Sequence, residues 1–397
     1  MRSLHPPVYA WSAGSFCALI LLAACGGGGT EPRIPSSITI DPTSLSFTAI
    51  GQTRQLSPTV IDQQGNPLPF AAVTWTSSDV GVATVSSTGL VTAHGGGSAE
   101  ITAKAGAATA LAEVQVVSFD IVVRFLSSST PSQRQAFADA QSRWESLVTG
   151  DLEDLQLTAP AQTCGSNSPS INETVDDLLI LVTLDSIDGP GNVLGSAGPC
   201  YIRDSDNLSV LGAMTFDTVD LADIEDAGLL EPLILHEMGH VLGFGSLWPT
   251  QGLLADPSLP PDPSQPPNPG ADPHFTGLQA IAAFNDVGGG GYSGAKVPVE
   301  DTGGEGTADG HWRESVFVNE LMTGFVDPGQ NPLSVVTVAS LGDQGYTVNL
   351  AGADPYSLPP GVTAFRARPR FKLGNDVLRL PIKKVDRAGR VREVLQR

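Results

Sequence analysis

The chain has 397 residues, of which 41% are hydrophobic and 16% are charged, and its formal net charge is −21 at pH 7. This composition is ordinary for folded protein, and the length predicts two or three domains. A nucleic-acid partner is disfavoured, because a chain this acidic is repelled by phosphate backbones.

The first 24 residues predict a secretory signal peptide. Arg2 precedes the apolar run SFCALILLAA, which is shorter than the ~20 residues of a membrane-spanning helix. The run ends in LAAC, which resembles the lipobox of bacterial lipoproteins and implies an acylated Cys25, followed by a Gly-rich tether over residues 25–35. Gly26 in place of aspartate implies the outer membrane. A plain signal peptide or an uncleaved anchor is the alternative.

Residues 36–118 predict a β-sandwich. Segments such as SITIDP, AAVTWTSS and SAEITAKAG alternate apolar residues with Thr and Ser, and turn residues separate them. The stretch VTWTSSDVGVATVSSTGLVTAHGGGSAEITA resembles the bacterial Ig-like domain of group 2. This resemblance covers nearly the whole segment and implies a spacer or adhesion module, in which His94 belongs to a surface loop.

A second domain is predicted over residues 119–350. FDIVVRFL predicts a strand, and an amphipathic helix follows that begins at Thr130 with a capping box to Gln133. Two more strands, DDLLILVTLDSI and SVLGAMTFDTVD, precede the helix EPLILHEMGHVLG, which is apolar on nearly every side and is therefore expected to be buried. This order of elements indicates an α/β sandwich.

Cys164 and Cys200 of the second domain predict a disulfide bond. Export places them in an oxidising compartment, and the other two cysteines, Cys17 and Cys25, fall in the signal and lipidation segments. Closing a loop of this length stabilises a fold by about 3–4 kcal/mol in the chain-entropy description. Two free buried thiols are the alternative.

The helix EPLILHEMGHVLG contains the motif H-E-x-x-H. His236 and His240 are four residues apart and share one helix face, so both imidazoles can bind one metal ion. Glu237 lies beside them and is expected to take the proton of a water bound to zinc, whose pKa the metal lowers to about 7. Two imidazoles and a carboxylate are costly to bury in an apolar helix without a metal or a full set of hydrogen bonds. A buried helix with two hydrogen-bonded histidines is the alternative.

A catalytic zinc needs a third protein ligand, and several residues are candidates. Gly243 fits the pattern H-E-x-x-H-x-x-G-x-x-H, but position 246 is serine where that pattern has its last histidine. His274 and His311 lie farther along the chain. A glutamate serves in the other branch of zinc proteases, and the candidates are Glu300, Glu305, Glu314 and Glu320. That branch expects its glutamate on a nearby helix, which the Pro-rich residues 249–273 disfavour.

One family matches these pieces in order. HEMGHVLGFGSLW, a long insertion over residues 246–310, and HWRESVFVNELMTG together resemble leishmanolysin, a surface metzincin protease. The resemblance spans about residues 120–350 and implies an α+β metzincin catalytic domain with Glu237 as the catalytic residue. The implied zinc ligands are His236, His240 and His311. Met322, in the ELM stretch, is implied to pack beneath the metal, whereas taken alone it could be ordinary core.

The resemblance has two further implications. The segment GAMTFD, residues 212–217, is similar to the edge strand on which metzincins pair an extended peptide substrate, although a plain core strand is an equal alternative. Eukaryotic members hold a zinc-blocking cysteine in a pro-segment, whereas no cysteine stands between Cys25 and the catalytic domain here. A thiol switch in that segment is excluded, so any latency requires another device.

Residues 351–397 form a basic tail with eleven Lys and Arg against four Asp and Glu. The stretch VLRLPIKKVDRAGRVREVL predicts a hairpin that turns at Asp386–Gly389 and docks on the acidic body or on an anionic envelope surface. A solvated, disordered tail is the alternative.

Together these features predict a lipid-anchored zinc endopeptidase that hydrolyses peptide bonds of extracellular or envelope proteins. Its expected cofactor is one zinc ion, and its expected partners are protein or peptide substrates and the membrane that holds the anchor. The alternative is a surface adhesion or binding lipoprotein in which the Ig-like domain acts and the metal domain is inert. Peptide cleavage that a chelator inhibits would separate the two.

Overall fold

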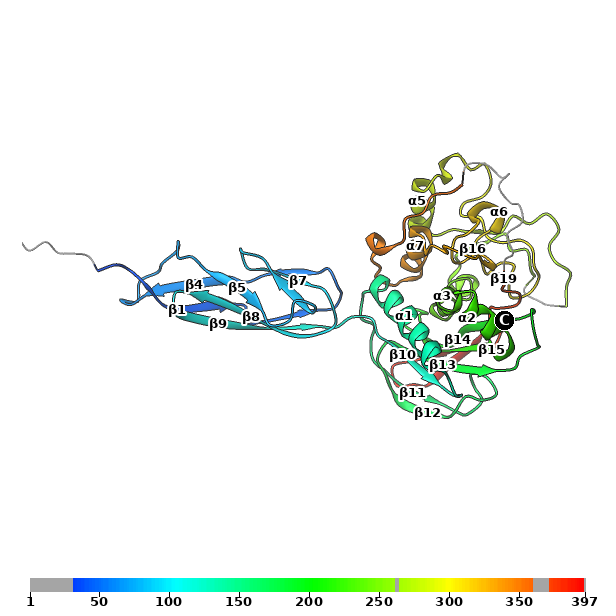
Figure 1. Ribbon diagram of the computed structural model, residues 1–397, viewed down its shortest axis with the longest axis horizontal. Coiled ribbons are helices and arrows are strands. Elements are labelled where there is room, and N and C mark those ends of the chain that lie inside the picture. The colour runs from blue at the N-terminus through cyan, green and yellow to red at the C-terminus, as the bar shows by residue number, and fades with distance from the viewer. Residues whose placement is uncertain (1–30, 261–263, 360–370, 396–397) are drawn as a thin grey trace, which may run out of the picture.

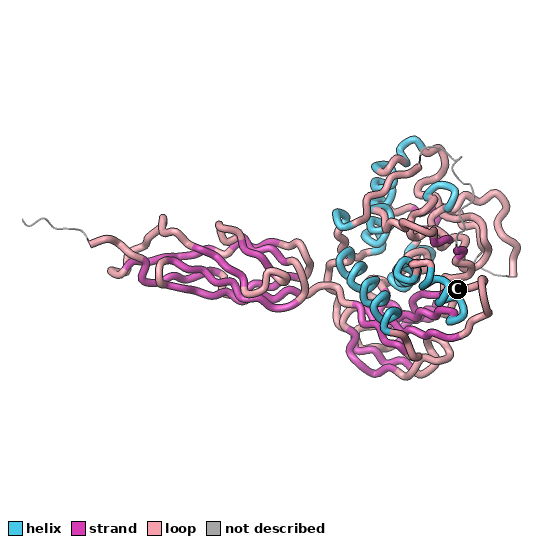
Figure 2. Tube along the Cα trace, in the orientation of Figure 1, coloured by secondary structure: helices cyan, strands magenta, loops and turns pink. Residues whose placement is uncertain are grey.

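The computed structural model describes residues 31–260, 264–359 and 371–395. The predicted signal peptide, the lipidation residue Cys25 and the first part of the tether lie outside the described residues. Two domains follow, an elongated β domain and a larger domain of helices and strands, which meet end to end (Figure 1). Figure 2 shows that helices occur in the larger domain, while strands and loops build the elongated one.

The N-terminal domain is a sandwich of short strands, as the alternating pattern predicts. One sheet has the order β2-β9-β8-β5, a second has the order β3-β7-β6, and β1 pairs with β4. The strands are β1 (Pro35–Asp41), β2 (Ser44–Phe47), β3 (Thr53–Gln55), β4 (Ser57–Asp62), β5 (Thr74–Ser77), β6 (Ala83–Val85), β7 (Leu90–Ala93), β8 (Gly97–Ala105) and β9 (Ala108–Val116). Phe47, Leu56 and Ile101 are fully buried between the sheets, and His94 is exposed as expected.

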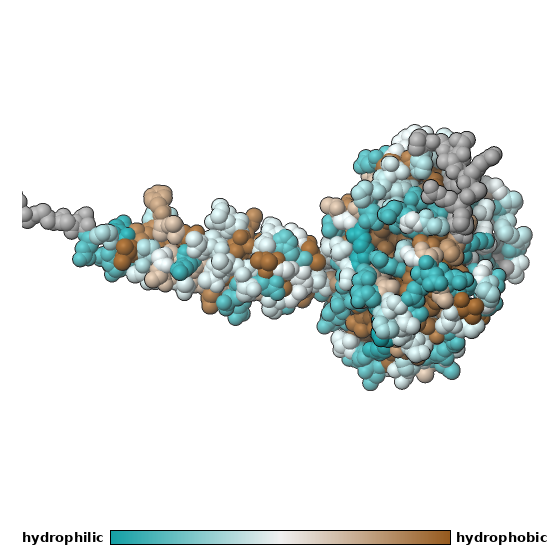
Figure 3. All heavy atoms as spheres, in the orientation of Figure 1, coloured by the Kyte–Doolittle hydropathy of each residue, from teal (hydrophilic) through white to brown (hydrophobic). Residues whose placement is uncertain are grey.

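The two domains are joined by main-chain hydrogen bonds. The Ile50 N–H donates to the Thr149 carbonyl at 3.3 Å, and the Asp151 N–H donates to the Thr48 carbonyl at 3.2 Å. Phe119, where the composition changes, is buried in the second domain with its ring 5.7 Å from that of Tyr346. Figure 3 shows apolar side chains scattered over the face of both domains in view, without one large patch.

A six-stranded mixed sheet organises the second domain, in the order β10-β13-β15-β14-β20-β21. The strands are β10 (Ile121–Phe125), β13 (Leu178–Asp185), β14 (Gly195–Arg203), β15 (Ser209–Asp217), β20 (Ile382–Val385) and β21 (Val391–Leu395). β10, β13 and β15 run parallel, and β14 runs antiparallel to β15. Residues 212–217 therefore lie in an inner strand, and the prediction that they form the edge strand is wrong. β15 pairs with β13 on one side and with the antiparallel strand β14 on the other, so both of its edges are occupied.

Two helices pack on one face of this sheet. α1 (Pro131–Leu147) begins with the expected capping box between Thr130 and Gln133. α3 (Leu230–Leu242) lies over β14 and β15, where the absent side chain of Gly212 permits close contact, since a Cβ there would stand 2.4 Å from Val241 Cγ1. The Trp144 indole of α1 donates to the Leu235 carbonyl of α3 at 2.9 Å. α3 is therefore central and buried, as its apolar character predicts.

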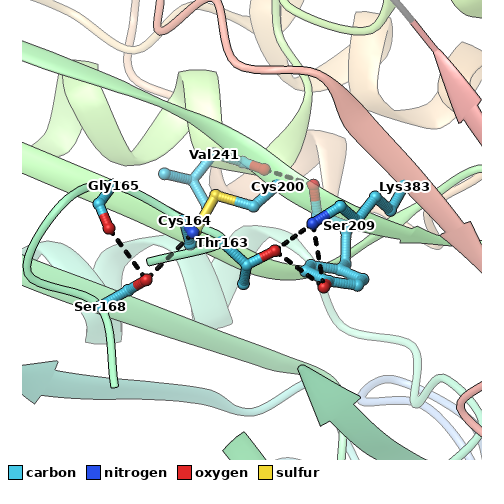
Figure 4. The surroundings of a disulfide bond; sticks show 9 residues. Thr163, Cys164, Gly165, Ser168, Cys200, Ser209, Val241 and Lys383 are labelled. Carbon is cyan, nitrogen blue, oxygen red and sulfur yellow. Dashed lines mark hydrogen bonds between the residues drawn. A yellow bond between two sulfur atoms is a disulfide. The ribbon is translucent and has the colours of Figure 1, made fainter. Parts of the chain in front are cut away.

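The opposite face of the sheet is covered by a hairpin and a disulfide. β11 (Leu155–Ala159) pairs with β12 (Ile171–Val175), and their inward residues pack with those of β13 and β15. Cys164 and Cys200 form a disulfide with Cα atoms 5.5 Å apart, which fastens the loop between these strands to β14. Figure 4 shows the bond beside Thr163 and Lys383, so the tail strand β20 also reaches this region.

The second half of the domain is built from short elements. They are α2 (Thr218–Asp226), α4 (Trp248–Gln251), β16 (Leu254–Ala255), β17 (His274–Phe275), α5 (Leu278–Asp286), η1 (Gly289–Gly291), α6 (Glu314–Phe317), β18 (Phe325–Val326), α7 (Val335–Gln344) and η2 (Leu350–Gly352). Within the predicted insertion, β16 pairs with β17, so this part of the chain folds back on itself. Residues 351–358 belong to the body, because Asp354 pairs with Arg143 at 2.8 Å and the Leu358 N–H donates to the Val287 carbonyl.

The basic tail forms the predicted hairpin within residues 371–395. β20 pairs with β21, and the Gly389 N–H closes the turn on the Asp386 carbonyl at 2.8 Å. The hairpin docks by extending the sheet, with β20 parallel to β14 at Tyr201–Arg203. Its remaining element, β19 (Phe371–Lys372), pairs with β18. Sheet extension is therefore the principal mode of docking, with the Arg387–Glu153 ion pair at 2.6 Å beside it.

Candidate metal centre

Three imidazoles converge on one point beside α3. His236 and His240 lie one turn apart on that helix, and His311 comes from the end of the insertion. Their Nε2 atoms are 3.0 Å apart for His236 and His240, 3.1 Å for His240 and His311, and 3.2 Å for His236 and His311. All three side chains are fully buried. The structure thus brings together the three histidines that the sequence proposes as ligands.

The other nitrogen of each ring is bound to a main-chain carbonyl. His236 Nδ1 lies 2.7 Å from the Leu321 oxygen, His240 Nδ1 lies 2.9 Å from the Phe244 oxygen, and His311 Nδ1 lies 2.9 Å from the Thr307 oxygen. A carbonyl only accepts, so each Nδ1 carries a proton. Each neutral ring then directs an Nε2 lone pair at the shared point, which is how histidines that bind metal are held.

This arrangement fits a zinc ion. Three lone pairs facing one another repel unless a cation stands between them. Ligand atoms at the zinc–nitrogen distance of ~2.0–2.1 Å in a tetrahedron are about 3.3 Å apart, which is close to the observed Nε2 separations. Burial lowers the pKa of His236, and it lowers the pKa of His240 to about 4, which favours the neutral form of these two rings.

The turn after α3 contacts the segment that carries His311. Gly243 ends the helix with φ +119°, and the next carbonyl, that of Phe244, returns to His240. A Cβ on Gly245 would stand 2.0 Å from the Gly310 oxygen, so the two backbones approach this closely only because residue 245 is glycine. Ser246, which stands where a third histidine was sought, instead donates its hydroxyl to the His240 carbonyl at 2.7 Å.

Met322 lies against the helix beneath the imidazoles. A Cβ on Gly239 would be 2.9 Å from Met322 Cε and 3.0 Å from Met322 Sδ, so the thioether covers this glycine of α3. The Trp312 N–H donates to the Met322 carbonyl at 3.0 Å, which ties the methionine turn to the segment that holds His311. Met322 is therefore in contact with the helix between the two histidines.

Glu320 holds this turn together through hydrogen bonds. The sequence suggested Glu320 as a possible metal ligand and gave no sign of this structural role. Its carboxylate is fully buried and accepts from the Met322 N–H, the Ser334 N–H and hydroxyl, and the Thr337 hydroxyl. Thr337 in turn accepts from the Trp312 indole at 2.8 Å. A buried acid with these partners holds the turn rather than a metal. Among the described residues, none of the four candidate glutamates, Glu300, Glu305, Glu314 and Glu320, belongs to the histidine cluster.

His274 stands away from the centre. It begins β17, opposite Ala255 of β16, and its Nδ1 lies 2.8 Å from the Asp272 carbonyl. The side chain is half-buried and does not belong to the histidine cluster. The geometry thus selects His311 over His274.

Glu237 is a buried acid without a hydrogen-bond partner. Its side chain is fully buried, and neither carboxylate oxygen meets a donor within the described part of the chain. A Cβ on Gly195, the first residue of β14, would stand 3.2 Å from Glu237 Oε1, so the start of this strand lies against the carboxylate. Burial, with the charge of Asp376, raises the pKa of Glu237 well above its ordinary value. Such a group is suited to exchange protons.

A fourth residue, Asp376, joins the histidines and was not foreseen. Its Oδ2 lies 3.0 Å from His311 Nε2, 3.2 Å from His236 Nε2 and 3.8 Å from His240 Nε2. Burial alone lowers the pKa of His311, but the Asp376 carboxylate reverses this and raises it. Asp376 is one of four acids in a basic tail, and no local pattern distinguishes it from the others.

Comparison with known proteins identifies the N-terminal domain. Residues 36–116 match the family described as Bacterial Ig-like domain (group 2). This part of the chain is therefore a bacterial Ig-like domain. No curated protein matches the chain. Within the described residues, no helix is long and apolar enough to cross a membrane.

Several solved structures are similar to part of the chain. Domains 4 and 5 of the S-layer protein SbsC are 31% identical, over 22% of this chain and 54% of that one, with a TM-score of 0.20. The Yersinia pseudotuberculosis adhesin InvE is 18% identical over 21% of this chain and 27% of its own, with a TM-score of 0.15. A GH10 xylanase with a bacterial Ig-like domain from termite gut is 18% identical over 35% of this chain and 29% of its own, with a TM-score of 0.14. The chain thus spans about half of the first of these structures.

Proposed function

We propose that the chain is a zinc-dependent endopeptidase of the metzincin type, similar to leishmanolysin, that acts at the bacterial cell surface. The observation that carries the proposal is the convergence of three buried Nε2 atoms within 3.2 Å of one another, beside a buried acid without a partner. His236, His240 and His311 would hold the metal, and Met322 would support the helix that carries two of them.

A zinc ion bound there would supply Lewis acidity and a water of lowered pKa. Glu237 would take the proton of the attacking water and return it to the leaving amine. Its burial and raised pKa favour this role, because a carboxyl group exchanges protons best when its pKa approaches the working pH. The carbonyl partners of the three Nδ1 atoms would fix the orientation of the imidazoles throughout.

The substrate would be an extended peptide that pairs with β14. This strand begins beside Glu237, and its inner edge is already paired with β15. Main-chain hydrogen bonds to its other edge, along which the tail lies in this structure, would provide affinity with little dependence on sequence. The Ig-like domain would hold the catalytic domain away from the envelope, as a spacer beyond the predicted lipid anchor at Cys25.

Metal analysis and a peptide-library digest of the exported protein test the proposal. We expect one zinc per chain, internal cleavage of extended peptides, loss of cleavage with a chelator, and recovery when zinc is restored. The alternative, a surface adhesion lipoprotein with an inert metal domain, predicts no cleavage in any of these samples. Its supporting observation is the bacterial Ig-like domain over residues 36–116.

A further inference from the structure

The tail that follows the catalytic domain passes directly across the candidate metal centre. Asp376 Oδ2 lies 3.0–3.8 Å from the three Nε2 atoms, and its side chain is fully buried. The other oxygen, Oδ1, has no hydrogen-bond partner within the described residues. Three nitrogens and one carboxylate oxygen are a complete tetrahedral set for zinc. The tail therefore supplies an atom at the position that a catalytic site keeps open.

The same segment meets β14 in an isolated parallel β-bridge between Ala197 and Val377. The Ala197 N–H donates to the Asp376 carbonyl at 2.7 Å, and the Leu378 N–H donates to the Ala197 carbonyl at 2.7 Å. Farther along, β20 occupies the edge of β14 at Tyr201–Arg203. These main-chain groups are the ones that an extended peptide would use on this edge. The tail and a peptide substrate therefore compete for one surface.

The loop that carries His311 is shaped to receive this segment. The Val377 N–H donates to the Gly306 carbonyl at 3.3 Å, and a Cβ on Gly306 would stand 2.4 Å from Asn375 Oδ1. Asn375 itself has φ +58°, a left-handed conformation that bends the chain immediately before Asp376. On its other side, Leu373 is fully buried, and its N–H donates to the Gly324 carbonyl at 3.1 Å. The tail is thus seated by contacts on both sides of Asp376.

We propose that residues 371–378 are an autoinhibitory segment, in which Asp376 binds the active-site metal as its fourth ligand while the backbone occupies the substrate edge of β14. This inference rests on the proposed function. The group that faces the imidazoles is a side-chain carboxylate and not a peptide carbonyl, so the segment blocks the site without presenting a bond to be cleaved. Glu237 is fully buried while the tail is seated, which leaves it no access to water.

The Asp376→Ala variant of the full chain tests the proposal, with Asp376→Asn as a second variant of nearly the same size. Glu393→Gln is the matched control, because Glu393 is an exposed acid on β21 of the same tail. Each protein is loaded with zinc for peptide cleavage and with cobalt(II) for its visible absorption spectrum, which reports the ligands around the metal. A peptide library serves as the substrate.

We expect Asp376→Ala to keep one metal per chain, to change the cobalt spectrum, and to raise the cleavage rate at least about tenfold, because the wild-type rate is limited by the fraction of chains with the tail displaced. Asp376→Asn should change both readouts in the same direction, and Glu393→Gln should match the wild type.

Two outcomes would contradict the autoinhibitory role, and a third would separate metal binding by Asp376 from the proposed endopeptidase function. If Asp376→Ala has the wild-type cobalt spectrum and cleavage rate, then Asp376 is not a ligand and the autoinhibitory role is wrong. If both Asp376 variants lose the metal, then Asp376 is a permanent structural ligand, which also contradicts the role. If the spectrum changes but no variant cleaves any peptide, then the assignment of Asp376 as a ligand stands and the endopeptidase function fails.

Discussion

The two domains bury carboxylates in different ways. In the Ig-like domain, Asp62 is buried, and both of its oxygens are bonded, Oδ1 to the N–H groups of Gln64 and Asn66 and Oδ2 to Arg33. In the second domain, Glu237 is buried, and neither of its oxygens has a hydrogen-bond partner among the residues that the structure describes. A buried acid whose oxygens all accept hydrogen bonds stabilises a fold. A buried acid without hydrogen-bond partners costs stability and is a candidate for a binding or catalytic site. The difference supports the proposal that the chemistry takes place in the second domain.

Glu320 shows that the distinction also holds within the second domain. It lies in the methionine turn close to His311, yet its carboxylate accepts four hydrogen bonds from the Met322, Ser334 and Thr337 groups. We therefore expect replacement by Gln to reduce peptide cleavage without loss of stability at Glu237, and to reduce stability at Glu320. The predictions below test this contrast, from the largest expected effect to the smallest.

Replacing Glu237 by Gln should reduce peptide cleavage by several orders of magnitude, roughly 1,000-fold or more, because the group that carries the proton is removed. Zinc content should stay at the wild-type level, since Glu237 is not a ligand, and stability should not fall. Metal analysis, cleavage rates and denaturant unfolding measure the three quantities. Glu231→Gln is the control, an exposed acid in the first turn of the same helix. Full activity of Glu237→Gln would show that another group is the base.

His311→Ala should weaken zinc binding at least about 100-fold, because even the outer hydrogen-bond partners of metal ligands are worth 10–100-fold. Cleavage should be lost with the metal. His274→Ala is the matched variant, a half-buried histidine of the same insertion outside the cluster, and it should retain the metal. Competition with a chelator of known affinity measures both proteins. The reverse behaviour would require a site built around His274.

Replacing Glu320 by Gln should lower the unfolding free energy of the second domain by about 2–3 kcal/mol, because an amide has one acceptor oxygen where the carboxylate has two and directs a donor at other donors. Denaturant unfolding of the zinc-loaded protein measures this change. The fall should be larger than that of Glu237→Gln. Equal stability of the two variants would remove the proposed contrast between bonded and unbonded buried acids.

Ile101→Ala in the Ig-like domain should leave zinc content and cleavage rate within about twofold of the wild type. The residue is fully buried in β8, so the substitution should destabilise that domain by about 2–5 kcal/mol. Calorimetry and peptide cleavage on the same sample test the separation. A large loss of cleavage would mean that the sandwich does more than hold the catalytic domain in place.

The part of the candidate site that lies on one helix could be predicted from the sequence. The spacing of His236, Glu237 and His240 on one helix can be read from five consecutive positions, and Gly243 indicates the turn that follows. The order of later motifs led to His311 and Met322, both of which lie at the helix in the structure. These features depend on short-range geometry, which periodicity and turn chemistry describe.

The missed features depend on pairings between distant segments. Residues 195–199 are Gly, Ser, Ala, Gly and Pro, which is not a strand pattern, yet they form β14 because β15 and the tail pair with them on both sides. Asp376 reaches the histidines only because the tail returns to this edge, 140 residues after His236. No spacing rule connects positions so far apart.

The central claim is that the three converging imidazoles hold a zinc ion. Anomalous diffraction at the zinc absorption edge, from crystals of the zinc-loaded full chain, measures this directly. The account predicts one strong peak bonded to the Nε2 atoms of His236, His240 and His311, with Asp376 Oδ2 as the fourth neighbour. A map without a peak between these three nitrogens, or with zinc bound at another site, would contradict it.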